Sequence, residues 1–352
     1  MKTADNRQKK NPAVRFALMT ALMLFSIITY TGCGYESPVS KSDFCLNTIC
    51  EITIYNDMSR DEAEQILDDA FGVIRDCEAK LSRTLPDSEV TEINNAGGER
   101  IRVSEETAEV IETANTVSAE SEGAFDITVG DITELWDFRS KTPRVPDDSE
   151  IAELLTHVDY SLVSTDGDRV TISDPQTSID LGGVAKGYIT DRVCDFLEAG
   201  GVTRAVVNLG GNVGVLGEKE ENTPWTVGIE QPFADRTELI GKVEVTDAVV
   251  VTSGIYERNF EVDGKIYHHI LNPATGYPAE TDLDAVTVTA KRGNSGFCDA
   301  VSTACLVMGK DKAVEFIERM QKKYPDMGLE AAFIDNNGDI VQTDGMKITF
   351  SK

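Results

Sequence analysis

The stretch DLGGVAKGY, residues 180–188, marks the point where a strand-like pattern changes to a helical one. Its paired glycines, Gly182 and Gly183, let other groups approach the backbone closely, and Lys186 begins a helix expected over residues 186–197. Backbone N–H groups at a helix start, beside a lysine, form a site for an anion. The stretch has neither the Walker spacing nor GxGxxG. An ordinary strand-to-helix turn with a surface lysine is an equal alternative.

Around this stretch, strand patterns outnumber helical ones. Ser59 and Glu62 form a capping box before a long amphipathic helix, and another helix is expected over residues 105–118. Strand patterns occupy residues 49–55, 169–173, 204–209, 225–229, 242–252, 285–290 and 331–334. Hairpin turns are expected at the Asp-Gly pair 263–264 and the Asn-Gly pair 337–338. Strands joined by hairpins predict an α+β fold, with largely antiparallel sheets and helices packed on one side.

The N-terminus has the pattern of an export signal. Basic residues precede an apolar run, and small residues stand directly before Cys33, as in a bacterial lipobox. We therefore expect a signal peptide over residues 1–33 with acylation of Cys33, a tether over 34–43 and a folded domain over 44–352. Tyr30 stands where a lipobox prefers leucine, so cleavage without acylation is the alternative. These features predict an extracytoplasmic protein, lipid-anchored to a bacterial cell membrane.

The chain is strongly acidic, with a formal net charge of −28. Removal of the basic leader makes the remainder more acidic still. We therefore expect no binding to nucleic acid, because such a surface repels phosphates. The absence of a CxxC pair disfavours a zinc site. Buried thiols are expected at Cys77, Cys194, Cys298 and Cys305, whereas Cys45 and Cys50 are left open as a candidate pair.

Two neighbouring histidines, His268 and His269, stand in an extended segment before Asn-Pro and Thr-Gly-Tyr-Pro turns. Neighbouring side chains of an extended segment point to opposite faces, so at most one ring faces a given site. The turns would fix that ring at the mouth of a pocket, where it could serve as an acid or base. His157, a lone histidine, is interpreted as structural.

Asp299 and Thr303 are four residues apart on an expected helix and so share one face, with Ser302 beside them. A carboxylate with hydroxyls is an oxygen-ligand set suited to Mg²⁺, which completes its shell with phosphates and water. A helix cap or a hydrogen bond to a backbone carbonyl is the plainer explanation of the same residues. Residues 123–138 mix aromatic and turn residues, and either pack around Trp136 or supply a wall for a flat ring.

Taken together, these motifs resemble the ApbE family of FAD:protein FMN transferases. The resemblance covers about residue 44 to the C-terminus. It is carried in order by LPDSEV (85–90), GAFDITVG (123–130), DLGGVAKGY (180–188), NLGGNV (208–213), TSGIYER (252–258), HHILNPATGYP (268–278) and DAVSTA (299–304). Such an ordered set is far more specific than any one motif. The resemblance implies an ApbE-like, T-fold-like architecture.

Membership would imply Mg²⁺-dependent transfer of FMN from FAD to a serine or threonine hydroxyl of an exported or membrane acceptor protein. The product would be a phosphoester, with release of AMP. The family pattern places the metal at Ala185 (through its carbonyl), Asp299, Thr303 and, as a further contributor, Ser302. It places FAD at Ala124, Phe125, Asp126, Asp180, Gly182, Gly183, Lys186, His269 and Ile270. His269 would deprotonate the acceptor hydroxyl.

Some positions depart from the family pattern. Leu46 stands within a segment where relatives commonly have MGT, and Thr84 stands where many have an aromatic residue against the flavin. How the flavin ring is held is therefore left open. Two rival functions also remain. With water as nucleophile, the same site would be a Mg²⁺-dependent FAD pyrophosphatase giving FMN and AMP; without chemistry, the protein would be a flavin-binding lipoprotein.

Overall fold

The structure is a computed structural model that describes residues 38–234 and 238–350. The expected signal peptide, Cys33 and residues 34–37 of the expected tether lie outside the described residues. Within the described part of the chain, no helix is long and apolar enough to cross a membrane.

A fully antiparallel sheet forms the centre of the described chain. Its eight strands have the order β1-β2-β6-β7-β10-β13-β14-β15 within residues 38–234 and 238–350. Their bounds are β1 Val39–Cys45, β2 Thr48–Ile54, β6 Ala205–Leu209, β7 Asn212–Leu216, β10 Ala248–Gly254, β13 Leu283–Lys291, β14 Glu330–Asp335 and β15 Ile340–Gln342. Each strand pairs in antiparallel register with its neighbour, which confirms the predicted sheet type.

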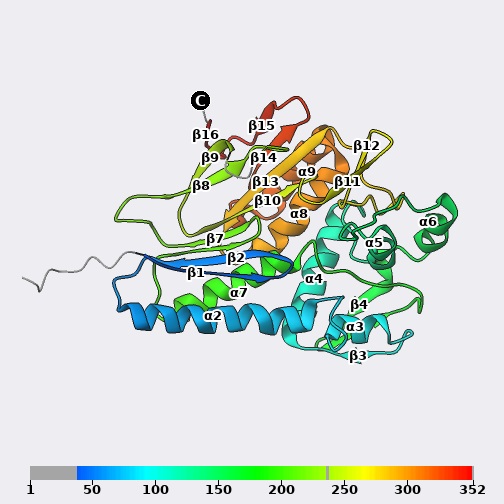
Figure 1. The fold of residues 1–352 in the computed structure, drawn as a ribbon, viewed down its shortest axis with the longest axis horizontal. Coiled ribbons are helices and arrows are strands. Elements are labelled where there is room, and N and C mark those ends of the chain that lie inside the picture. The colour runs from blue at the N-terminus through cyan, green and yellow to red at the C-terminus, as the bar shows by residue number, and fades with distance from the viewer. Residues whose placement is uncertain (1–37, 235–237, 351–352) are drawn as a thin grey trace, which may run out of the picture.

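Helices cover one face of this sheet, as Figure 1 shows for α2 and α7 below β1 and β2. They are α2 (Arg60–Leu81), α7 (Ala185–Ala199), α8 (Ser295–Met308) and α9 (Lys310–Lys323). The predicted cap is present, because the Ser59 side chain accepts a hydrogen bond from the Glu62 N–H. Leu67, Phe71 and Ile74 of α2 are fully buried at helical spacing against the sheet.

A smaller antiparallel sheet lies on the opposite face, with the order β16-β9-β8. Its strands are β8 (Trp225–Glu230), β9 (Leu239–Val245) and β16 (Ile348–Phe350). Side chains alternate between the faces of a strand. Accordingly, Val249 and Val251 of β10 join the helix-side core, while Val250 between them packs with Val243 of β9. The part of the main sheet around β10 is thus buried on both sides.

The remaining elements form the end of the molecule beside the N-terminal ends of α7 and α8. They are α3 (Glu89–Asn94), β3 (Ile101–Arg102), α4 (Glu105–Glu120), α5 (Gly130–Trp136), α6 (Asp148–Leu155), β4 (Val163–Thr165), β5 (Arg169–Ile172), β11 (Asn259–Val262) and β12 (Lys265–His268), with short 3-10 turns at Tyr160–Leu162 and Pro325–Met327. Both predicted hairpin turns are confirmed: Asp263 and Gly264 have positive φ between β11 and β12, and Gly338 has positive φ between β14 and β15.

Two sequence expectations need correction, and one open question concerns a cysteine pair. Residues 39–43, assigned to the tether, belong to β1, because they pair with β2 along its whole length. The apolar run 242–252 is not one strand: Asp247 has φ 44° and turns the chain from β9 into β10. Cys45 and Cys50 are both buried and both free, and the Cys50 thiol instead donates to the Cys45 carbonyl at 3.5 Å. The four predicted buried thiols, at Cys77, Cys194, Cys298 and Cys305, are confirmed.

Candidate functional site

A cavity of about 690 Å³ opens beside the starts of α7 and α8. Almost all of the residues singled out from the sequence line it, although they come from four separate segments. These residues are Ala124, Phe125, Asp126, Asp180, Gly182, Gly183, Ala185, Lys186, His269, Ile270, Asp299 and Thr303. Ser302 is not in the wall of the cavity.

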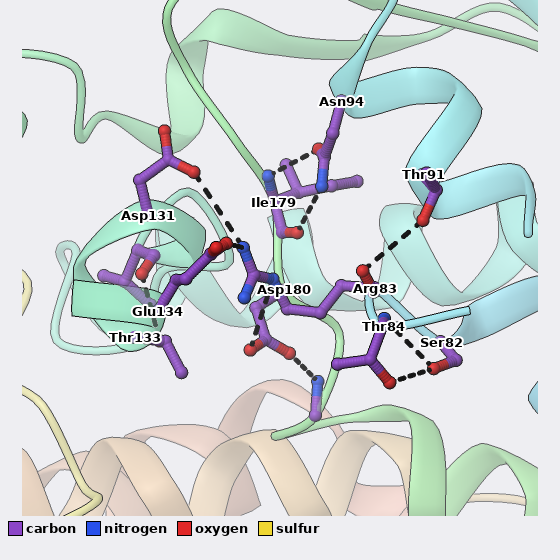
Figure 2. Close-up of polar contacts among 12 residues, drawn as sticks. Ser82, Arg83, Thr84, Thr91, Asn94, Asp131, Thr133, Glu134, Ile179 and Asp180 are labelled. Carbon is purple, nitrogen blue, oxygen red and sulfur yellow. Dashed lines mark hydrogen bonds and ion pairs between the residues drawn. The ribbon is translucent and has the colours of Figure 1, made fainter. Parts of the chain in front are cut away.

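The turn before α7 is held rigidly. Asn94 of α3 accepts a hydrogen bond from the Ile179 N–H at 2.8 Å and donates one to the Ile179 carbonyl at 3.0 Å (Figure 2). The Asp180 Oδ1 accepts from the Gly182 N–H at 2.8 Å. A side chain at Gly183 would place its Cβ 2.9 Å from the Phe125 ring, so a glycine is needed there. The glycines of the motif therefore serve close packing around the cavity.

Helices α7 and α8 approach each other closely where the site lies. The buried carboxylate of Asp191 on α7 accepts hydrogen bonds from the N–H groups of Ser295 at 2.6 Å and Gly293 at 3.0 Å, and so caps α8. Burial raises the pKa of Asp191 to about 6. This cap fixes the start of α8, four residues before Asp299.

Asp299 is 1% exposed and is held by three donors from two elements, α7 and β7. Its Oδ2 accepts from the Gly187 N–H at 3.0 Å. Its Oδ1 lies 3.3 Å from the Asn212 Nδ2 and 3.4 Å from the Lys186 Nζ. The predicted anion-binding lysine is therefore beside the predicted metal carboxylate, and both face the cavity with Thr303.

The oxygen ligands that the cavity presents fit Mg²⁺. Within the described residues, no group of three or more His, Cys, Asp or Glu side chains could hold a metal ion. Beside the starts of α7 and α8 the cavity offers instead the buried carboxylate of Asp299, the hydroxyl of Thr303 and the backbone of Ala185. Mg²⁺ binds hard oxygen ligands and commonly keeps several waters and substrate phosphates, so few protein oxygens suffice. Softer metals would require histidine or thiolate ligands.

Ser302 has a different place from the one the family pattern gives it. Its side chain is fully buried, donates to the Asp299 carbonyl at 2.8 Å and lies 2.7 Å from the Ser253 hydroxyl on β10. This is the plainer role that the sequence left open for this cluster, a hydrogen bond to a backbone carbonyl.

The two neighbouring histidines face apart, as their extended backbone requires. His268 is buried, with Nε2 3.1 Å from the Ala279 carbonyl. His269 lines the cavity, with Nδ1 3.3 Å from the Arg258 carbonyl. Burial, and then the positive charge of Arg258, lower the pKa of His269 to about 3, although part of the ring remains open to the cavity. The ring is therefore neutral at pH 7.

His157 has the structural role expected for it. Its Nδ1 lies 2.6 Å from Asp174 Oδ2, and it does not line the cavity.

Residues 123–138 both pack around Trp136 and supply part of the cavity wall. Asp126 accepts from the Thr128 N–H at 2.8 Å and the Tyr160 N–H at 2.9 Å, and burial raises its pKa. Trp136 is buried in an aromatic cluster and donates to the Gly276 carbonyl at 2.8 Å. Phe138 stacks on Trp136 with centroids 5.6 Å apart and also lines the cavity.

The sequence did not single out several charged residues of the wall, notably Arg83 and Arg258. Arg83 directly precedes Thr84, which also lines the cavity, as does Leu46 from the β1–β2 turn. Both departures from the family pattern therefore fall within the site. The TSGIYER motif contained Arg258, but no pattern in the sequence distinguished Arg83 from a surface arginine.

Comparison with known proteins agrees with this geometry. The sequence profile of the ApbE family matches residues 46–327. A FAD:protein FMN transferase of Klebsiella pneumoniae (strain 342) is 36% identical, covering 83% of this chain and 89% of that protein. One of Treponema pallidum (strain Nichols) is 33% identical, covering 86% and 87%. The crystal structure of the ApbE protein from Thermotoga maritima matches with a TM-score of 0.77 and 34% identity, covering 88% and 97%.

These matches define the class of the protein, which is a transferase. The chain belongs to the ApbE family. The predicted fold class and the family resemblance are thereby confirmed.

Proposed function

We propose that the protein transfers FMN from FAD to a serine or threonine hydroxyl of an acceptor protein, with Mg²⁺, and releases AMP. The observation that carries this proposal is the meeting of Lys186, Asp299 and a neutral His269 in one cavity. In a chain of net charge −28, a cation beside a metal-binding carboxylate is suited to holding a pyrophosphate. The names of the relatives agree with this chemistry.

The residues divide the work by their positions. Lys186 and the start of α7 would bind phosphate oxygens. Asp299, Thr303 and the Ala185 carbonyl would hold Mg²⁺, which neutralises charge on the phosphates when bound. The departing AMP keeps the bridging oxygen of the pyrophosphate, while the acceptor oxygen forms the new bond to the FMN phosphorus.

His269 is placed to take the proton of the acceptor hydroxyl. A carbonyl oxygen only accepts, so the contact with Arg258 places the ring proton on Nδ1 and leaves a lone pair on Nε2. A hydroxyl is a poor nucleophile until its proton is removed, so a neutral imidazole with this tautomer suits a general base. Bound phosphate would offset the positive charges that lower the pKa of this ring.

Mass spectrometry of an acceptor peptide tests the proposal. The soluble chain without residues 1–33 is incubated with FAD, Mg²⁺ and a peptide that carries an acceptor serine or threonine. The proposal requires a Mg²⁺-dependent gain of one FMN on the hydroxyl residue together with free AMP. Free FMN and AMP, with no modification of the peptide or of an acceptor protein, would replace the transferase proposal with the FAD pyrophosphatase. Intact FAD throughout would mean that the protein is a flavin-binding lipoprotein without this chemistry.

We also propose that the enzyme acts outside the cytoplasm, anchored through an acylated Cys33. The basic leader, the apolar run and the small residues before Cys33 support this location. Metabolic labelling with a radioactive fatty acid checks it. We expect label in the wild-type membrane fraction and none in Cys33→Ser; equal labelling of both would contradict the anchor.

A further inference from the structure

Two large apolar side chains are exposed on the hairpin formed by β1 and β2, at the edge of the main sheet (Figure 1). Phe44 is 66% exposed and Ile49 is 58% exposed. They stand directly opposite each other in the register of the hairpin, so their side chains lie side by side on one face. Elsewhere in residues 38–234 and 238–350, no two exposed large apolar residues are paired in this way. We call these two residues the apolar pair.

The apolar pair lies on a corner of the sheet that the described residues leave open. Cys45 and Cys50, next to the pair along the two strands, are buried in the helix-side core, so the pair points to the opposite face. The small sheet covers that face around β10, where Val243 packs with Val250. At the hairpin the same face instead carries exposed polar residues, namely Ser40, Ser42 and Glu51. A partner molecule can therefore reach the apolar pair without rearrangement of the fold.

The apolar pair is continuous with the mouth of the cavity. Leu46 and Asn47, the two residues of the hairpin turn, have positive φ and both line the cavity. The Leu46 N–H donates to Glu78 Oε1 of α2 at 3.0 Å, so the turn is fixed against that helix. Phe44 stands two residues before Leu46, about 7 Å along the strand. A chain that enters the cavity over this turn therefore passes the apolar pair.

Position and charge indicate which molecule covers the pair. The proposed reaction brings a protein to the mouth, because the acceptor hydroxyl must reach His269 and its neighbours in the chain then lie on the rim. Faces that bind membranes place lysine or arginine around their apolar residues. Here the neighbouring charge is the carboxylate of Glu51, and Lys41, the only cation in the two described strands, is paired with Asp68 of α2. The acceptor protein is therefore favoured over a lipid surface.

We propose that Phe44 and Ile49 form a docking surface for the acceptor protein and hold an apolar side chain that stands a few residues from the target hydroxyl. This inference rests on the proposed function, because it takes a protein as the acceptor. It adds a determinant of acceptor choice that is separate from the FAD and Mg²⁺ sites, since neither residue lines the cavity. Loss of the pair should therefore change the use of the acceptor and leave the binding of FAD unchanged.

Variants of an acceptor peptide test the docking surface. The peptide modified in the transfer assay is made with leucine or asparagine, which are similar in size, at each position on either side of the target hydroxyl. The value of kcat/KM for FMN transfer is measured for each peptide. We expect the wild type to prefer leucine over asparagine about tenfold at one position, through KM, because a leucine is partly buried there.

The enzyme variant that removes the surface is Phe44→Thr with Ile49→Thr, in which threonine keeps the preference for a strand. In this double variant the preference for leucine should fall to about onefold. The matched control is Phe350→Thr, because Phe350 is an exposed phenylalanine on β16 that does not line the cavity. It should keep the full preference. The Kd of FAD and the thermal unfolding of all three proteins should be unchanged, since the replaced side chains are exposed.

Each other outcome overturns the assignment. If the wild type and the double variant prefer leucine equally, or if neither prefers it, the docking surface fails while the transferase proposal stands. If the chain without residues 1–33 sediments with vesicles of anionic phospholipid and the double variant does not, the pair binds a membrane. If light scattering shows a dimer that the double variant loses, the pair joins two copies of this chain. If the wild type modifies no peptide and no acceptor protein, the inference and the proposed function both fail.

Discussion

The main-chain N–H of Gly187 on α7 donates to Asp299 Oδ2 on α8, with the two atoms 3.0 Å apart. The contact exists because the helices touch at this glycine: a Cβ on Gly187 would lie 2.1 Å from the Ser295 carbonyl oxygen. The orientation of the candidate metal carboxylate is therefore set by the backbone of another helix. The glycine inside DLGGVAKGY is needed for that approach.

Gly187→Ala should push the two helices apart. We expect a loss of about 1–3 kcal/mol in the free energy of unfolding, typical of an overpacked core, and a higher Mg²⁺ requirement. Urea unfolding measures the first effect and activity against Mg²⁺ the second. The matched control is Gly72→Ala on α2, where a Cβ would meet nothing within 4 Å; it should gain up to about 1 kcal/mol from helix propensity. Equal effects of the two variants would contradict this account.

Asp299→Asn should raise the Mg²⁺ concentration needed for half-maximal activity at least about tenfold, because the shape is kept but a charged oxygen ligand is lost. Ser302→Ala should leave that concentration unchanged. It should lower the free energy of unfolding by about 1 kcal/mol, since its hydroxyl serves hydrogen bonds inside the protein. Activity titrations with Mg²⁺ separate the two residues. A raised Mg²⁺ requirement in Ser302→Ala would restore it to the metal site.

His269→Ala should slow FMN transfer by about 10²–10⁴ while FAD still binds, since a general base contributes about that factor. Single-turnover transfer and FAD binding are measured on the same preparation. His157→Ala serves as control, because His157 lies outside the cavity. Unchanged transfer in His269→Ala would remove the base from the mechanism.

The lowered pKa of His269 predicts a pH dependence of stability. The folded state keeps the ring neutral down to about pH 3, whereas the unfolded chain binds a proton near pH 6.5. The contribution of this group to the free energy of unfolding is therefore fully present above about pH 6.5 and is lost as the pH falls towards 3. His269→Gln should lose stability less steeply than the wild type over this range. Parallel curves from urea unfolding at pH 7.5 and pH 5 would refute the shift.

The sequence alone was sufficient for the local elements of the fold. The 3.6-residue spacing of apolar residues predicted α2 and α7, and Asp-Gly predicted the β11–β12 turn. These features depend on contacts between near neighbours in the chain, which a linear pattern records. The same reasoning missed the turn at Asp247, because an apolar run alone does not show where a buried strand ends and the next begins.

The sequence also determined which residue types the site contains, through motifs in a fixed order. Only the tertiary structure decided how they are used. Ser302 and Thr303 are neighbours on α8, yet one hydroxyl faces β10 and the other the cavity. Arg83 became a buried member of the wall only because α5 and the turn at Asp180 close around it. Burial and direction depend on residues far apart in the chain, so they follow from packing and not from local spacing.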